Sequence, residues 1–136
     1  MIVLDTSFLL AFHDEGDVNH TAARVSMSRL LDGAWGKGLL LELVFVDTLS
    51  ILKRARPAGV AQQLGSDLLK ARELDFVPAS EHFRAVWTEF QTDFLSPLSF
   101  TSHAVAWTAR QRAGGKVLTF DPALRESPGV IVEPGG

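Results

Sequence analysis

The stretches Met1-Ile2-Val3-Leu4-Asp5 and Val117-Leu118-Thr119-Phe120-Asp121 decide the fold class of this chain. Each is a short apolar run followed by an aspartate, which is typical of a buried strand in a parallel sheet. In an open α/β sheet, the crevice beyond the carboxyl ends of the strands holds the functional groups. Two carboxylates brought to that edge from opposite ends of the chain would repel each other unless a cation lay between them. The pair therefore predicts a site for a hard divalent metal ion.

The composition favours one compact domain with oxygen-ligand chemistry. The chain has 136 residues, 46% of them hydrophobic, and this size allows a sizeable core. It contains no cysteine, which excludes disulfides and thiolate zinc sites and favours magnesium or manganese. We therefore predict a single domain over residues 1–136.

The charge and hydropathy patterns limit the possible partners. The formal net charge of −3 argues against a non-specific nucleic-acid coat, although an enzyme with a local basic rim remains compatible with it. No uncharged apolar stretch is long enough to span a membrane, and no basic segment precedes the first apolar run. We expect a soluble, cytoplasmic protein without a membrane partner.

Segments typical of strands and helices alternate along the sequence. The expected strands cover residues 1–4, 39–41, 74–77, 116–120 and 130–132. The expected helices cover residues 8–12, 20–31, 43–54, 57–72, 80–94 and 99–112. Pro57 is expected at the start of its helix, and Ser80 and Ser99 are expected to cap theirs. The alternation predicts an α/β fold, a three-layer α/β/α sandwich around a central, mostly parallel sheet.

Asp47 is an acid within an apolar helical segment. Its neighbours on the helix surface are Leu43, Val44 and Ile51. If that face is buried, the ionised carboxylate needs a cation or hydrogen-bond donors, because an unpartnered buried charge is costly. The alternative is that the helix is partly exposed and Asp47 faces solvent.

Ser102 begins a stripe of small residues with Ala106, Ala109 and Ala113. Small residues let a helix lie close to a sheet, so Ser102 is expected to point inward towards the crevice of Asp5. The alternative is a local role, in which the serine binds free backbone amides in the first turn of the helix.

Several segments resemble, in order and spacing, the signatures of PIN-domain ribonucleases, and the resemblance covers nearly the whole chain. These segments are Leu4-Asp5-Thr6-Ser7, Asp17-Val18-Asn19-His20, Glu42 to Leu49, Leu98 to Ser102, and Leu118-Thr119-Phe120-Asp121. The resemblance implies a PIN-like fold and a phosphodiesterase dependent on magnesium or manganese.

The resemblance also implies roles for individual residues. Asp5, Asp47 and Asp121 match the acids that bind the metal and catalyse hydrolysis. Thr6 and Thr119 match hydroxyl residues that support the first and last acids.

Ser102 departs from the family pattern, which typically has aspartate there, so it would offer the metal a neutral hydroxyl and the site has one negative charge fewer. Neither neighbouring candidate is expected to replace this acid. His103 points about 100° away around its helix, and Glu42 matches a family position outside the metal shell.

Two functions follow from these observations. The first is an endoribonuclease, the toxin of a VapBC-type toxin–antitoxin pair, with RNA as substrate and an antitoxin and a second copy of the chain as protein partners. The alternative is a catalytically weakened PIN-like domain that binds RNA or protein. The basic run Lys53-Arg54-Ala55-Arg56 agrees with RNA contact, but we favour the simpler explanation that it complements the negative end of a helix dipole.

Overall fold

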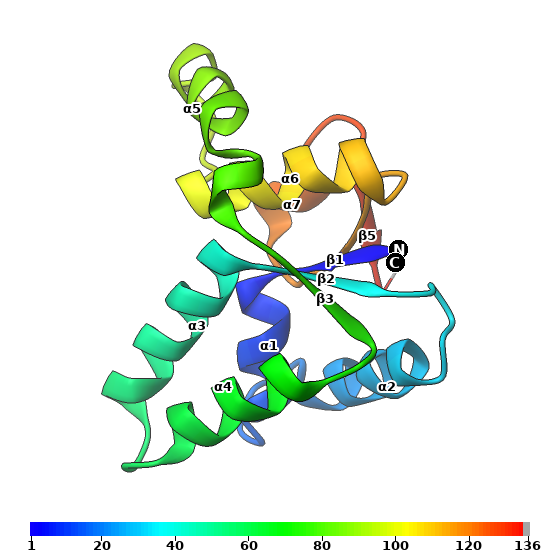
Figure 1. The fold of residues 1–136 in the computed structure, drawn as a ribbon, viewed down its shortest axis with the longest axis vertical. Coiled ribbons are helices and arrows are strands. Elements are labelled where there is room, and N and C mark those ends of the chain that lie inside the picture. Colours follow the sequence, from blue (N-terminus) through cyan, green and yellow to red (C-terminus); the bar gives the residue numbers. More distant parts are fainter. Residues whose placement is uncertain (135–136) are drawn as a thin grey trace.

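The computed structural model describes residues 1–134, in which a five-stranded sheet lies between two layers of helices (Figure 1). The strand order is β3-β2-β1-β4-β5, and every neighbouring pair is parallel. The strands are β1 (Ile2–Leu4), β2 (Gly38–Leu41), β3 (Leu74–Val77), β4 (Lys116–Leu118) and β5 (Ile131–Glu133). The three-layer sandwich is confirmed, and its sheet is parallel throughout.

The helices divide between the two faces of the sheet according to the direction in which the chain crosses it. One layer holds α1 (Thr6–His13), α2 (His20–Leu31), α3 (Glu42–Ala55) and α4 (Val60–Lys70). The opposite layer holds α5 (Phe83–Thr92) and α6 (Phe100–Arg112), and the short α7 (Pro122–Arg125) follows β4. From β1 to β3 the chain moves towards one edge of the sheet, and after β3 it returns to place β4 on the other side of β1. Because parallel crossovers are right-handed, the helices of the returning connection lie on the other face. No helix within residues 1–134 is long and apolar enough to cross a membrane.

The reversal makes β1 and β4 neighbours at the centre of the sheet. Val3 pairs with Val117, and Leu4 pairs with Leu118. The backbone amide of Asp5 continues this ladder by donating to the carbonyl of Leu118 at 3.0 Å. Asp5 and Thr119 therefore leave the sheet side by side, at the topological switch point where α/β proteins place their sites.

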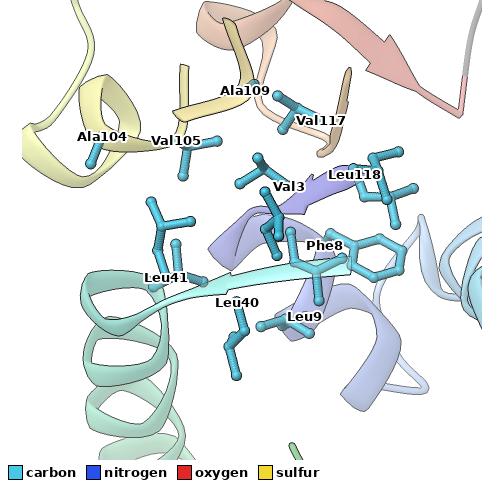
Figure 2. Close-up of a cluster of buried hydrophobic side chains, with 14 of the residues drawn as sticks. Val3, Phe8, Leu9, Leu40, Leu41, Ala104, Val105, Ala109, Val117 and Leu118 are labelled. Atoms are coloured by element: carbon cyan, nitrogen blue, oxygen red, sulfur yellow. The ribbon is translucent and has the colours of Figure 1, made fainter. Parts of the chain in front are cut away.

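Small side chains on α6 let this helix lie directly on the central strands. Ala104, Ala106 and Ala109 are almost fully buried, as is Val3 on β1. Figure 2 shows Ala104, Val105 and Ala109 on one side of the strands and Phe8 and Leu9 of α1 on the other. This packing fixes the beginning of α6, and with it Ser102, at the carboxyl edge of the sheet.

The starts of α4 and α5 lie three residues later than the sequence predicts, and α1 begins at Thr6, two residues before the predicted start. Helix α4 begins at Val60 instead of Pro57, because Pro57 accepts a turn bond from the Val60 amide and Gly59 takes a left-handed conformation with φ of 93°. The fixed φ of proline suits such a turn as well as it suits a helix start.

Helix α5 begins at Phe83 and ends at Thr92, and Ser80 lies in a 3-10 helix over Ala79–Glu81 instead of capping it. The predicted cap at Ser99 is confirmed, since its Oγ accepts from the Ser102 amide at 3.1 Å.

Helix α3 is only half buried. Its buried residues are Val44, Thr48 and Leu52, while the side chain of Ile51 is 37% exposed. One flank of α3 is therefore free to border a cleft, and Asp47 lies on that flank.

Candidate active site

A cleft of about 640 Å³ opens at the carboxyl edge of β1 and β4. Its lining comes from the residues that follow these two strands, from α3 and from the first turn of α6. The lining residues are Asp5, Thr6, Ser7, Asp47, Ser50, Ile51, Arg54, Ser99, Thr101, Ser102 and Asp121. The predicted residues Asp5, Asp47, Ser102 and Asp121 thus share one cleft, and Thr6 lies beside them.

Asp5 is the most deeply placed acid, with only 4% of its surface exposed. Its Oδ2 accepts hydrogen bonds from Thr119 Oγ1 at 2.7 Å and from Ser7 Oγ at 2.8 Å. Burial raises the pKa of Asp5 above its ordinary value, and the negative charge of Asp121 adds to the rise. The bonds from Thr119, Ser7 and the Thr6 amide oppose this rise in pKa without cancelling it. An ionised Asp5 is therefore costly without a nearby cation.

Two hydroxyls join the loops that carry Asp5 and Asp121. Ser7 Oγ lies 3.0 Å from Thr119 Oγ1 and accepts from the Phe120 amide at 3.0 Å. Thr119 Oγ1 in turn accepts from the Asp121 amide at 3.0 Å. The structure places Thr119 in contact with the first acid, and it adds Ser7, for which the sequence analysis suggested no role.

Asp47 and Asp121 are each held through one carboxylate oxygen. Asp47 Oδ2 accepts from Thr101 Oγ1 at 2.7 Å, and Asp121 Oδ1 accepts from the Ala123 amide at 2.9 Å as the N-cap of α7. The other oxygen of each carboxylate makes no hydrogen bond with residues 1–134. Both acids are thus oriented by the protein and keep one oxygen for a ligand. Sequence analysis missed Thr101, because its partner lies on a different helix.

The Ser102 side chain meets the cleft but is also part of the helix cap. Ser99 Oγ accepts from the Ser102 amide and donates to Ser102 Oγ, both at 3.1 Å. The Ser102 side chain lines the cleft, as the first prediction held, whereas its Oγ accepts from Ser99 Oγ and from no backbone amide of residues 1–134, which differs from the alternative prediction.

His103 and Glu42 lie away from the cleft lining. The His103 ring is buried, with Nδ1 3.5 Å from Glu89 Oε2. Glu42 Oε1 accepts from the Ala79 amide at 2.8 Å. Neither residue replaces the missing acid at position 102.

The oxygen donors of the cleft suit a hard cation such as magnesium or manganese, although its acids are not gathered into a cluster. The residues of the lining carry three carboxylates and one guanidinium, that of Arg54, and their other polar side chains are hydroxyls. Thr6 Oγ1 is buried there without a hydrogen-bond partner in residues 1–134. Within the same residues, no three acidic or histidine side chains form a ready-made metal cage. Magnesium fits such a donor set, because it keeps several of its waters and needs only one or two protein carboxylates.

Comparisons with known proteins agree with this geometry. The chain matches the PIN domain family over residues 2–129, whereas no curated protein matches it. One similar solved structure is VapC20 of Mycobacterium tuberculosis, described as a Sarcin-Ricin loop cleaving toxin. The two share a TM-score of 0.80 over 96% of this chain and 97% of VapC20, with 18% sequence identity, which shows a common fold. Because the family match spans nearly the whole sequence, the chain belongs to the PIN-domain family.

Proposed function

We propose that this protein is an endoribonuclease dependent on magnesium or manganese, and that it is the toxin of a VapBC-type toxin–antitoxin pair. The observation that carries the proposal is the meeting of Asp5, Asp47 and Asp121 in one cleft of a PIN fold, each from a different element. The structural similarity to VapC20 supports the toxin assignment.

In the proposed reaction, Asp5 and Asp121 would hold the metal, with Asp47 and the Ser102 hydroxyl as further ligands. The ion supplies Lewis-acid activation of water and neutralises charge on the phosphodiester. Thr101 holds one oxygen of Asp47, which restricts the orientation of this carboxylate. Ser7 and Thr119 fix Asp5 in the same way, so the acids are oriented before RNA arrives.

Metal binding and proton release are coupled at Asp5 in this proposal. The raised pKa of Asp5, caused mainly by burial, moves its ionisation to higher pH when no cation is bound. A metal ligand must be ionised, so binding displaces the proton. Metal affinity is therefore expected to increase with pH through the range in which Asp5 ionises.

The decisive test is cleavage of a single-stranded RNA with manganese by the wild type, Asp5→Asn and the control Asp75→Asn. Asp75 lies on β3 outside the cleft. We expect the wild type and Asp75→Asn to cleave RNA alike and a chelator to stop both. Asp5→Asn should lower the cleavage rate more than about 100-fold. This loss exceeds the one that is usual when a residue that only hydrogen-bonds to a metal ligand is replaced. Equal rates for Asp5→Asn and the wild type would contradict the proposal.

A catalytically weakened domain that binds RNA or protein is the second candidate. The observations that favour it are the serine at position 102 and the absence of a three-acid cage in residues 1–134. RNA binding by a wild type that neither cleaves RNA nor binds manganese in calorimetry would establish this alternative.

A further inference from the structure

The basic run at the end of α3 divides into three separate environments. Arg54 lines the cleft of the aspartates. Lys53 lines a different hollow, between α3 and α4, with Ala61 and Gln62. Arg56 pairs with Asp14, with Nη2 and Oδ1 2.9 Å apart. The run is thus not a uniform basic patch, and only one of its side chains faces the site.

Arg54 is the one cationic residue in the described lining of the cleft, and it is unpaired. Its guanidinium makes no ion pair or hydrogen bond with any other residue in 1–134. Arg56 and Arg110 pair with Asp14 and Glu89, whereas several arginines outside the cleft, such as Arg84, are as unpaired within residues 1–134 as Arg54. Arg54 is distinguished from these by its place in the cleft lining. A free guanidinium in a cleft with three carboxylates retains its donors for a ligand.

The position of Arg54 on α3 relates it to the acids. It follows Asp47 by seven residues, which is close to two helical turns, so both residues lie on one flank and about 10 Å apart along the axis. Ser50 lies between them on the same flank and also lines the cleft. The flank therefore offers a carboxylate at the inner end, a hydroxyl in the middle and a guanidinium at the outer end.

We propose that Arg54 binds a backbone phosphate of RNA beside the phosphodiester held at the aspartates. The forked guanidinium matches the oxygens of a phosphate, and charge-assisted bonds of this kind are among the stronger ones. This inference rests on the proposed nuclease function. Contacts to phosphate fix the register of a strand without reading its sequence. Arg54 is accordingly a substrate-positioning residue whose contribution is the same for every RNA sequence.

Binding of fluorescent single-stranded RNA, measured by anisotropy over a series of salt concentrations, tests the inference. A non-cleavable analogue of the RNA stays intact during the measurement while manganese is present. Arg54→Gln should weaken binding about ten-fold at low salt. It should also reduce the slope of log affinity against log salt by about 0.7, the value for one phosphate contact on a single strand. The matched control Lys53→Gln removes one charge from the neighbouring residue and should change neither quantity.

Three outcomes would overturn the inference. The first is no RNA binding by the wild type, and the second is equal losses of affinity in Arg54→Gln and Lys53→Gln. The third is a lower melting temperature of metal-free Arg54→Gln than of the metal-free wild type, together with an unchanged salt slope. This result would mean that Arg54 reduces the repulsion among the aspartates and does not bind RNA. Intact RNA binding with the predicted slope change, but no cleavage when manganese is added, would overturn only the nuclease proposal.

Discussion

Ser102 is the residue at which the cleft differs most from the pattern of its family. We predict that Ser102→Asp tightens manganese binding and raises any ribonuclease activity, because an added carboxylate offsets ionic charge that a hydroxyl cannot. Without metal, the same substitution should lower the melting temperature, because a further negative charge joins Asp5, Asp47 and Asp121 in one cleft. Calorimetric titration with manganese and thermal denaturation with and without metal would measure both effects.

Ser80→Asp is the control for this substitution, because Ser80 is exposed on the 3-10 helix outside the cleft. It should leave manganese binding unchanged. If the wild type cleaves RNA well and Ser102→Asp does not raise the rate, three acids suffice for activity and the serine does not limit it.

The buried Asp5 carboxylate is expected to make the metal-free protein less stable as the pH rises. Its pKa is raised in the folded protein, mainly by burial, so its ionisation opposes folding above that pKa. Asp5→Asn removes the ionisation and should raise the melting temperature of the metal-free protein at pH 7. The gain should shrink as the pH falls through the raised pKa towards the ordinary value of 3.8. Melting curves in a chelator between pH 4 and 8 test this prediction, and a gain that is constant with pH would contradict it.

Among the secondary-structure elements, the connection between α6 and β4 requires a glycine for two reasons. Gly115 has φ of +86°, and a Cβ at this position would overlap the carbonyl oxygen of Gly129. Gly115→Ala should therefore destabilise the protein by about 3 kcal/mol or more, through backbone strain and displacement of the segment that leads to β5.

Gly114→Ala is the matched control, since Gly114 also has a positive φ of +59° but has open space around it. It should cost about 1–2 kcal/mol for the left-handed conformation alone. Urea denaturation of the two variants would separate the contributions. Equal losses would show that the contact with Gly129 is unimportant.

The strands and the acids that follow them could be predicted because their signals are local. A short apolar run followed by an aspartate identified β1 and β4, and the serine at position 99 identified the start of α6. The predicted starts of α4 and α5 were wrong, because proline and serine occur in turns as well as at helix starts.

The hydrogen bonds and the orientation of the basic run could not be predicted, because they depend on how distant elements meet. Thr101 contacts Asp47 only because the first turn of α6 packs near α3. Arg54 differs from Lys53 only in its angle around α3 relative to a cleft that the sequence does not display.

For the molecule as a whole, we predict a homodimer formed through α5. Phe83 and Trp87 lie one turn apart on α5, and Phe94 lies in the turn after the helix; these residues are 51%, 46% and 79% exposed. Exposed apolar patches of this kind mark surfaces that another protein chain covers. Light scattering at micromolar concentration should give the mass of a dimer for the wild type and of a monomer for Trp87→Arg. Val18→Arg is the control, because Val18 is 95% exposed on the loop before α2. A monomeric wild type would contradict the prediction.

The neighbouring positions of β1 and β4 also affect the protein while it is being made. A ribosome synthesises the chain from the N-terminus at about 5–20 residues per second, so the N-terminal segments emerge first. The nascent chain therefore presents Asp5 and Asp47 before β4 exists, and Asp5 then lacks both Thr119 and the neighbouring Asp121. If the protein is the toxin we propose, it stays inactive during translation and becomes harmful only when β4 joins the sheet. A partner that binds α1 or α3 on the ribosome would have time to neutralise the toxin before its first RNA is cut.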